Sequence, residues 1–338
     1  MLILILILAA GISFLVSLWC IQNAHRMGLM DVPNQRSSHN QPKPKGGGIG
    51  IASGMTLALA FGMFFNIVEF RPPYSILFLG SLLMAVLGFF SDRLHISPLI
   101  RMIFQALIAG GTGAFMGLSD TVEVGGWVIA LGFGKIIFAV IWMTAITNFY
   151  NFMDGIDGLA GMQGILMAAG IAVFGIILAE PTLVSSGWIL AGAIAGFLLL
   201  NKPPARIFMG DSGSYFLGFF IAGIALTDQR LFVPVAMMLG VFIFDTVVTL
   251  IRRVLNRERW YQAHRSHFYQ RAVKLGYSHA QVTLTLSFVI LFLMASAVFY
   301  LNGFGWMKKA IIIFTCLELG LLAFWVNLKE QEKGCYEH

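Results

Sequence analysis

Residues 2–22 read LILILILAAGISFLVSLWCIQ, a run without a single charged residue. A helix of about 20 apolar residues is long enough to cross the roughly 30 Å hydrocarbon core of a bilayer. Comparable runs recur along the chain. The eleven predicted spans are 2–22, 47–66, 74–90, 100–117, 127–147, 160–179, 184–200, 213–227, 231–251, 283–301 and 309–327. We therefore expect an all-α, polytopic membrane protein of 10 or 11 helices, built as one domain over residues 1–338.

The composition of the whole chain agrees with this fold class. Apolar residues make up 58% and charged residues 11% of the sequence, and the mean hydropathy is +0.82. A soluble domain carries about 25% charged residues, so an ordinary soluble globule is excluded. The net charge of +6 is typical of basic loops on the inner side of a membrane, so the expected partner is the bilayer and not nucleic acid.

The distribution of positive charge predicts the orientation. If the N-terminus lies outside, 17 of the 22 Lys and Arg residues fall in inside segments. Basic residues concentrate in cytoplasmic loops. We therefore predict an outer N-terminus and an inner C-terminus.

The inside loops also carry most of the polar and charged residues that could form a site. They comprise residues 31–50, 91–101, 148–161, 201–214 and 252–279. A transporter is the main alternative class, but it would place polar residues near the midplane and on both faces. Polar residues gathered on one face favour a single active site on the inner side.

The loop after the fifth span carries the first acidic candidates. Asn151, Asp154 and Asp157 are spaced three apart, so a helical turn would place them on one face. Carboxylates this close to apolar spans are costly unless a cation or a donor-rich ligand meets them. The alternative is that they cap the sixth span.

Two further acids follow the same logic. Asp211 lies in FMGDSGS, residues 208–214, where Gly210 allows backbone N–H groups to approach a phosphate while the carboxylate binds a metal. The alternative is a helix cap by Asp211 or Ser212. Asp92 follows the third span, where it is either a site residue or a charge at the membrane rim.

Basic residues occupy two other inside loops. His264, Arg265 and His267 lie in HRSH, which has no third ligand spaced for zinc and is better suited to a phosphate or pyrophosphate. The first inside loop combines basic residues with prolines and a glycine run, which allows close backbone approach. Its candidate residues are Arg36, Ser38, His39 and Lys45.

Asp245 lies within the ninth predicted span. An acid inside the membrane is a candidate site residue by default, and Arg252 or Arg253 is its expected partner, seven or eight residues on. Acidic residues that bind a divalent metal, next to basic residues that bind phosphates, are the usual arrangement in enzymes of phosphoryl transfer.

Four ordered motifs carry a family resemblance. They are RSSH…PKPKGGG at 36–48, NFMDGIDGLAG at 151–161, FMGDSGS at 208–214 and HRSHFYQR at 264–271. The chain resembles the polyprenyl-phosphate N-acetylhexosamine-1-phosphate transferases of glycosyltransferase family 4. Within that superfamily it is more similar to the WecA- and WbpL-like enzymes than to the MraY-like ones.

The resemblance implies a bacterial inner membrane enzyme with its N-terminus in the periplasm and its site and C-terminus on the cytoplasmic face. It implies transfer of sugar-1-phosphate from a UDP-N-acetylhexosamine to undecaprenyl phosphate, releasing UMP, with Mg²⁺ or Mn²⁺ as cofactor. The product would initiate O-antigen, lipopolysaccharide or other surface polysaccharide. The muramoyl-pentapeptide substrate of the MraY-like enzymes is the alternative, and the sugar and a homodimer stay open.

The implied roles map onto the same residues. Asp211 and Asp154 hold the metal, Asp92 orients or deprotonates the lipid phosphate, and Asn151 and Asp157 position the nucleotide. The residues expected to contact substrate are Arg36, Ser38, His39, Lys45, Gly210, Asp245, His264, Arg265 and His267. One departure concerns the first of two adjacent acids usual after the third span, which is Ser91 here.

Overall fold

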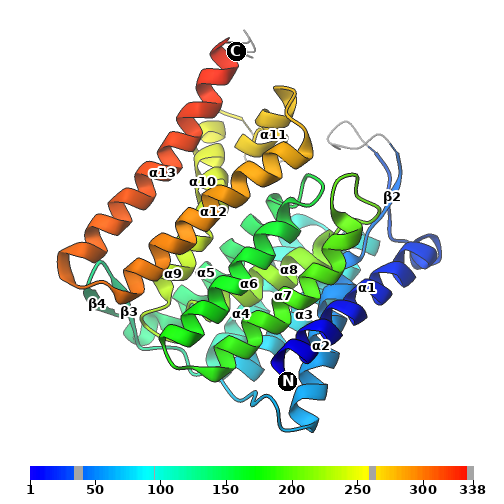
Figure 1. Cartoon of the computed structure of the whole chain (residues 1–338). Helices are drawn as coiled ribbons and strands as arrows, with labels where there is room; N and C mark the ends of the chain where they lie inside the picture. The colour runs from blue at the N-terminus through cyan, green and yellow to red at the C-terminus, as the bar shows by residue number, and fades with distance from the viewer. Residues whose placement is uncertain (34–40, 95, 259–263, 333–338) are drawn as a thin grey trace.

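The computed structural model describes residues 1–33, 41–94, 96–258 and 264–332, and within them the chain is almost entirely helical. Two short hairpins supply the strands β1 (Met30–Asp31), β2 (Lys43–Pro44), β3 (Thr121–Val124) and β4 (Trp127–Ala130). The helices in chain order are α1 (Leu2–Met27), α2 (Gly47–Phe64), α3 (Tyr74–Leu94), α4 (Pro98–Phe115), α5 (Lys135–Phe152), α6 (Leu159–Ile177), α7 (Pro181–Asn201), α8 (Gly210–Ile224), α9 (Phe232–Met238), α10 (Gly240–Leu255), α11 (Phe268–Lys274), α12 (His279–Asn302) and α13 (Gly305–Glu332). Figure 1 shows them as one bundle.

Nine of the described helices are long and apolar enough to cross a membrane. A tenth span is formed if α9 and α10 are taken together, and these two meet at a bend of 72°. The prediction of a polytopic helical membrane protein is confirmed. The count of eleven and the orientation of the termini stay predictions.

The difference in count comes from α8. This helix has 15 residues, about 22 Å of rise, which is shorter than the hydrocarbon core. Every residue from Ser212 to Ile224 is buried, and α8 packs against α2, α3, α5 and α6. A short helix is tolerated at membrane depth when protein surrounds it. The helix that begins with the FMGDSGS motif is therefore the centre of the bundle.

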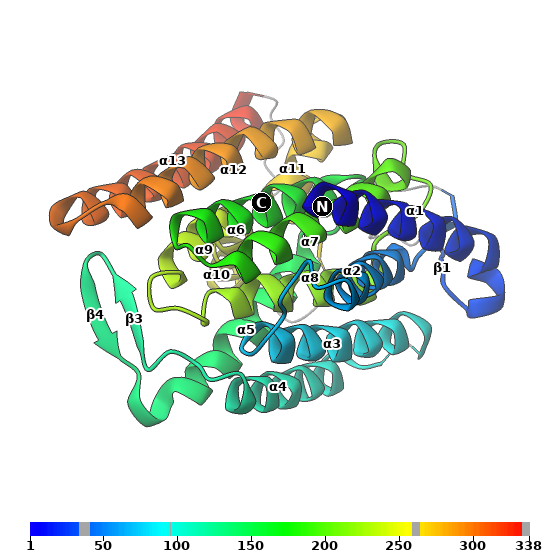
Figure 2. The same ribbon diagram turned by 60° about the horizontal axis from the view of Figure 1, so that its bottom comes forward.

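The predicted fifth span is wrong at its start. Residues 127–130 form strand β4, which pairs with β3 in register Val124↔Trp127, and the helix α5 begins only at Lys135. Gly125 and Gly126 both have positive φ, which allows the tight turn between the strands. Figure 2 shows this hairpin projecting beside the bundle, near the turn between α12 and α13.

Charge at the hairpin end is paired locally. Lys308 forms an ion pair with Glu123, Lys309 lies over the Trp127 ring at 4.8 Å, and Lys135 contacts Asp120 at 2.6 Å. Lys308, Lys309 and Lys135 are outer residues in the predicted topology, and the structure places all three at this hairpin end.

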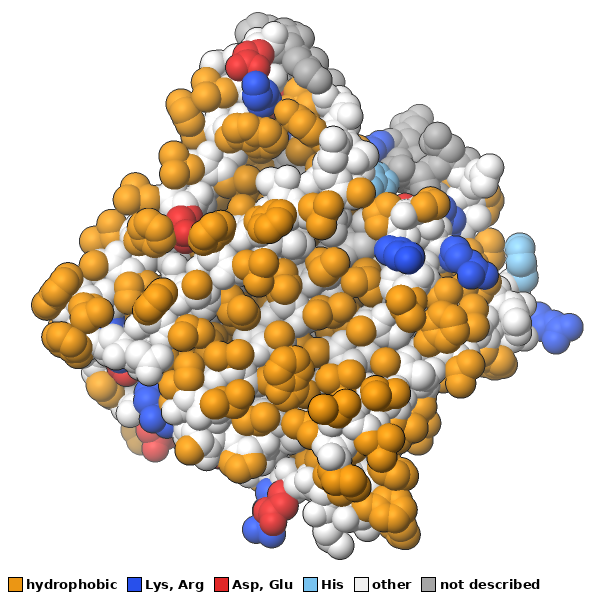
Figure 3. Space-filling view, viewed as in Figure 1, with side chains coloured by type: hydrophobic (Ala, Val, Ile, Leu, Met, Phe, Trp, Pro, Cys, Tyr) orange, Lys and Arg blue, Asp and Glu red, His pale blue; other side chains and the backbone are white. Residues whose placement is uncertain are grey.

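The opposite end collects the chemically rich loops. In Figure 1, α11, β2 and the ends of α5 and α7 lie toward the top and right, away from the β3–β4 hairpin. Figure 3 shows that the visible face is covered largely by hydrophobic side chains, with several Lys, Arg and His side chains near its upper right. This surface suits a lipid environment with a polar site at one end.

Candidate active site

Three helices bring the acidic motifs together at this end of the bundle. The last turn of α3 carries Ser91 and Asp92, the end of α5 carries Asn151, and the first turn of α8 carries Asp211. Close packing fixes their approach, because a Cβ built on Gly88 would lie 2.4 Å from the Asp211 carbonyl oxygen. The predicted clustering of these motifs is observed.

Asp211 is the most heavily contacted carboxylate of the cluster. Its Oδ2 accepts hydrogen bonds from Ser91 Oγ at 2.7 Å, Arg101 Nη1 at 2.9 Å and Tyr215 OH at 3.1 Å. Its Oδ1 accepts from Asn151 Nδ2 at 2.9 Å. Asp211 does not cap α8, whose N-cap is Met209 without a side-chain bond. The carboxylate is instead held in a fixed orientation by four donors.

Asp92 is buried on the other side of the α8 N-terminus. Its side chain is 3% exposed, and its Oδ2 accepts from the Ser212 backbone N–H at 3.4 Å. Lys45 Nζ lies 3.7 Å from Asp92 Oδ1 and 3.1 Å from Asp31 Oδ1. Burial at this depth excludes the alternative of a solvated charge at the membrane rim.

Lys45 is held in its charged form by these acids. Burial lowers the pKa of the Lys45 ammonium, but the charges of Asp92 and Asp31 outweigh burial, so the pKa lies above its ordinary value. The β1–β2 pairing places this side chain, because Lys45 follows β2 and its N–H donates to the Leu29 carbonyl at 2.8 Å.

Asp154 and Asp157 lie in a loop and not on a helical face. The helix α5 ends at Phe152, and the N-cap of α6 is Gly158, so neither acid caps α6. Burial, with Asp92 and Asp211 nearby, raises the pKa of Asp154 well above its usual value, although the Gly210 N–H donates to it. The expectation of one helical face is wrong, but Asp154 does join the other acids.

Gly210 is required by this geometry. Its φ is +74°, and a Cβ at this position would lie 2.6 Å from Asp92 Oδ2. The glycine run before α2 meets the same turn: the Gly47 and Gly48 N–H groups donate to the Phe208 and Met209 carbonyls at 3.0 and 2.9 Å. The first inside loop is thereby fixed against the FMGDSGS motif.

The donor set fits a divalent cation. Asp92, Asp154 and Asp211 repel one another in a buried site, as the raised pKa of Asp154 reflects. The Ser212 hydroxyl is buried beside Asp92 without a hydrogen-bond partner. Among the described residues no group of three His, Cys, Asp or Glu could hold a metal ion by itself, so a cation here would need ligands from the substrate. An open site of few carboxylates completed by phosphate oxygens is the Mg²⁺ pattern.

Asp157 lies apart from these three acids and joins separate loops. Its Oδ2 accepts from the Ala205 N–H at 3.0 Å and lies 3.7 Å from Lys43 Nζ and 3.6 Å from His279 Nδ1. Burial raises the pKa of Asp157, but the contacts with His279, Ala205 and Lys43 outweigh burial and lower the pKa overall. Asp157 therefore connects the loop after α7, strand β2 and the start of α12.

Asp245 anchors the HRSH segment to α10. Its carboxylate accepts from His267 Nδ1 at 2.9 Å, the Phe268 N–H at 3.0 Å and Thr249 Oγ1 at 3.1 Å. The expected pairing with Arg252 or Arg253 is wrong: Arg253 contacts Glu258 at 3.0 Å. The N–H groups at the start of α11 donate to the Asp245 carboxylate, so the N-terminus of α11 neutralises the charge that Arg252 or Arg253 was expected to neutralise.

The HRSH segment also contacts the acidic loop. Tyr269 OH donates to the Phe152 carbonyl at 2.8 Å, and the His267 ring lies 6.0 Å from the Phe152 ring. His264 Nδ1 lies 2.9 Å from Ser266 Oγ. Burial, with His267 and Arg253 nearby, lowers the pKa of His264 to about 4, so His264 is neutral at pH 7.

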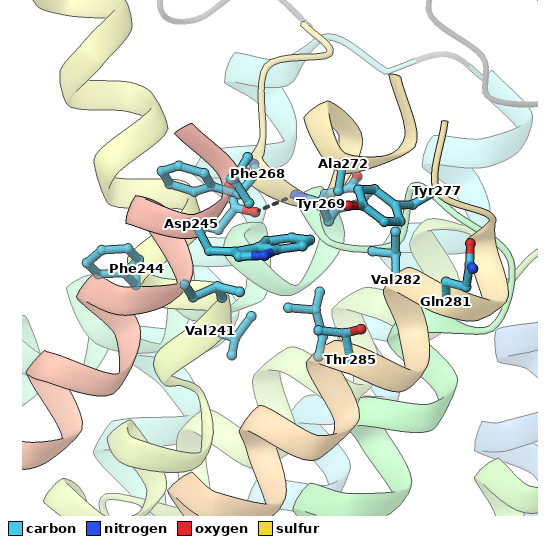
Figure 4. A pocket seen from close by; sticks show the side chains of 14 residues that line it. Val241, Phe244, Asp245, Phe268, Tyr269, Ala272, Tyr277, Gln281, Val282 and Thr285 are labelled. Atoms are coloured by element: carbon cyan, nitrogen blue, oxygen red, sulfur yellow. Dashed lines mark hydrogen bonds between the residues drawn. The ribbon is translucent and has the colours of Figure 1, made fainter. Parts of the chain in front are cut away.

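A cavity of about 210 Å³ lies between α10, α11, α12 and α13. Figure 4 shows Asp245 at its wall, bonded toward α11, with Phe268, Tyr277 and Val282 around the space. The lining is mostly apolar, and the one acid in it already holds α11. The cavity is thus a packing feature beneath the HRSH segment.

The structure adds residues that the sequence did not single out. Arg101 and Tyr215 contact Asp211, Lys43 and His279 contact Asp157, and Tyr269 bridges two motifs. A signal existed for Arg101, since it continues the buried stripe Gln105, Ala109 and Thr112 of α4 at helical spacing. Arg36, Ser38 and His39 lie outside the described residues, and Arg265 lies next to the His264 and His267 pair.

Fold and site together define a class: a polytopic membrane protein in which buried acids and basic side chains gather at one end of its helices. Residues 74–229 match the sequence profile of glycosyl transferase family 4. The match contains α3, α8 and the acidic loop, so the resemblance predicted from the motifs is confirmed.

Curated relatives agree with this assignment. The chain is 28% identical to the probable undecaprenyl-phosphate N-acetylglucosaminyl 1-phosphate transferase of Bacillus subtilis, over 89% of this chain and 85% of that protein. It is 29% identical to the undecaprenyl-phosphate alpha-N-acetylglucosaminyl 1-phosphate transferase of Escherichia coli K12, over 90% and 83%. A phospho-N-acetylmuramoyl-pentapeptide-transferase of Synechococcus is 28% identical over only 46% of this chain.

Proposed function

We propose that this protein transfers N-acetylhexosamine-1-phosphate from a UDP-sugar to undecaprenyl phosphate at the cytoplasmic face of a bacterial inner membrane. The observation that carries the proposal is the convergence of Asp92, Asp154 and Asp211 on the α8 N-terminus beside Lys45 and Arg101. The names of the full-length relatives support the same reaction, with N-acetylglucosamine as the first donor to test.

The proposed reaction is a direct displacement. An oxygen of the lipid phosphate attacks the β-phosphorus of the UDP-sugar, and the bond from that phosphorus to the oxygen bridging the two phosphates breaks. UMP leaves with the bridging oxygen, and the lipid carries the pyrophosphoryl sugar. The acceptor phosphate has its second pKa near 6 and is largely ionised at pH 7, so little proton abstraction is needed.

Each acidic residue has a proposed role in this reaction. Asp211 and Asp154 hold the metal, a Mg²⁺ or Mn²⁺ that neutralises pyrophosphate charge when bound. Asp92, buried beside Lys45, orients the lipid phosphate. Arg101 contacts Asp211, so a metal held by Asp211 would share this carboxylate with the guanidinium.

The remaining residues position the donor. Asn151 connects Asp211 to Ser214, which fixes the end of α5 against α8. His264, Arg265 and His267 are proposed to contact the pyrophosphate or sugar, and Arg36, Ser38 and His39 to contact the phosphates. Asp157 keeps the loops between them in place.

The product would begin a surface polysaccharide such as O-antigen, and we propose a homodimer as the working form of the enzyme.

An assay with purified protein, undecaprenyl phosphate and UDP-N-acetylglucosamine tests the reaction directly. We expect a lipid whose mass equals undecaprenyl phosphate plus one N-acetylhexosamine-1-phosphate less one water. A phosphorylated protein formed from the UDP-sugar alone would overturn direct displacement in favour of a two-step route.

A further inference from the structure

We propose that Arg101 is the residue that binds the phosphate group of the membrane-embedded acceptor lipid. This inference rests on the proposed function, because it names one contact between that site and its lipid substrate. Arg101 lies in the first turn of α4, at the end where the acids converge, and its side chain is 27% exposed.

One nitrogen of the guanidinium is committed to the protein. Arg101 Nη1 lies 2.9 Å from Asp211 Oδ2, 3.3 Å from Ser91 Oγ and 3.2 Å from Tyr215 OH. These partners come from α3 and α8, so they fix the plane and position of the guanidinium. A guanidinium held in place loses less entropy when it binds a second partner.

The rest of the guanidinium is available. Among the described residues no hydrogen bond or ion pair uses Arg101 Nε or Nη2. Arginine carries five N–H donors in a planar fork that matches two oxygens of a phosphate. A pinned Nη1 with a free Nε–Nη2 edge is therefore a preformed site for one phosphate group.

The surroundings of Arg101 favour a lipid as the source of that phosphate. The helix α4 lies at the edge of the bundle and packs chiefly on α3 and α5, as Figure 2 shows. Leu99 is 69% exposed, Leu94 62% and Phe104 49%, so apolar side chains flank Arg101 on its outer side. A headgroup at the bilayer surface can thus reach Arg101 with its tail still in the membrane.

The test compares two lipids that differ only in the presence of the phosphate group. Binding of undecaprenyl phosphate and of uncharged undecaprenol is measured on detergent-purified wild-type protein, on R101M and on R101K. A charge-assisted pair contributes about 1.5–3 kcal/mol, so R101M should bind undecaprenyl phosphate about 10- to 100-fold more weakly. Undecaprenol and UMP should bind all three proteins with affinities within about twofold.

The lysine variant separates binding from folding. R101K keeps a positive charge beside Asp211, so it should fold like wild type. A single ammonium cannot contact both Asp211 and two phosphate oxygens, so R101K should lose part of the preference for the phosphate lipid, less than R101M loses. R71M is the matched control, because Arg71 pairs with Glu69 at the other end of α3 and both side chains are more than three quarters exposed. It should bind both lipids as wild type does.

Two results would overturn the assignment. One is an unchanged preference for undecaprenyl phosphate over undecaprenol in R101M. The other is a loss of UMP binding with lipid binding intact, which would assign Arg101 to the nucleotide. A wild-type protein that prefers the phosphate lipid through Arg101 but releases no UMP would instead contradict the proposed function and leave this inference standing.

Discussion

Asp211 is the residue on which most of the site depends. It accepts from four side chains drawn from α3, α4, α5 and α8. The isosteric change Asp211→Asn removes the negative charge that opposes Arg101 and that a metal requires. We expect turnover to fall at least about 100-fold while the protein still elutes as a folded species in detergent.

The control for this variant is Asp120→Asn. Asp120 pairs with Lys135 at the hairpin end, and its side chain is 80% exposed. This change should leave turnover within about twofold of wild type, because exposed ion pairs contribute little. Near wild-type turnover in Asp211→Asn would remove Asp211 from the site.

His264 predicts how stability depends on pH. Its pKa is lowered from 6.5 to about 4, so the unfolded chain binds the proton more readily between these values. The contribution of this residue is therefore complete above pH 6.5 and is lost as the pH falls toward 4. Allowing for partial exposure, we expect a loss of about 1–2 kcal/mol.

Thermal unfolding between pH 7.5 and 5 checks this expectation. Wild-type protein should lose more stability over this interval than His264→Gln, which has no group to titrate at this position. Parallel pH curves for the two proteins would show that His264 is not buried as described.

The element scale explains which predictions from sequence succeeded. Most apolar runs became helices, because in a bilayer the backbone must satisfy its own hydrogen bonds. Residues 127–130 became a strand, since Gly125 and Gly126 form a turn that no hydropathy window detects. Asp154 and Asp157 lie outside a helix, because α5 ends at Phe152 and α6 begins only after Gly158.

The clustering of the acids was predictable from the sequence, but their contacts were not. The acids were found because charge near a membrane span is rare, so each one stands out in the sequence. Arg101 was not singled out from the sequence, because an arginine near the start of a helix is common in an inner loop. Its role depends on Ser91 and Asp211, which are 10 and 110 positions away.

The attachment of α11 to α10 gives a prediction at this scale. Asp245→Asn keeps the shape of the side chain but weakens its bonds to His267, Phe268 and Thr249. Hydrogen bonds to a buried charge contribute about 1.5–3 kcal/mol, so the melting temperature should fall by several degrees. Val247→Ile, two residues along α10 at a side chain that is 37% exposed, is the control and should melt within about one degree of wild type.

The packing of α2 on α8 gives another prediction about stability. A Cβ on Gly48 would lie 2.0 Å from the Gly213 backbone nitrogen, and backbone cannot move aside cheaply. We expect Gly48→Ala to cost at least about 1–3 kcal/mol and to reduce activity, since the α8 N-terminus moves with it. Gly111→Ala on α4 meets nothing within 4 Å and should be neutral. Equal stability of both variants would contradict this packing.

The acidic and HRSH motifs lie at one end of the molecule, and the orientation of this end is testable. The inner placement of α11 rests on the excess of Lys and Arg in the loops at that end. In a chain whose three native cysteines are replaced by serine, a cysteine replacing Asp120 should react with a membrane-impermeant maleimide in intact cells, and one replacing Arg257 should react only after lysis. The reverse pattern would invert the topology and place the site outside.

The asymmetry also accounts for how two dissimilar substrates could meet. The acids lie at the end of α3 and α8, the exposed apolar side chains of α4 lie beside them, and the HRSH segment lies across the acidic loop. A lipid can approach from the bilayer side and a nucleotide sugar from the water side. Under the proposed function, one end of the helical bundle would bind both substrates.

The central claim is metal-dependent transfer from a UDP-sugar to a polyprenyl phosphate. The measurement that tests it most directly is UMP release by purified protein with undecaprenyl phosphate and a panel of UDP-N-acetylhexosamines, with and without Mg²⁺. We predict UMP release from at least one donor, dependent on both the lipid and the metal. No release from any donor, under conditions where the Escherichia coli relative is active, would contradict the account.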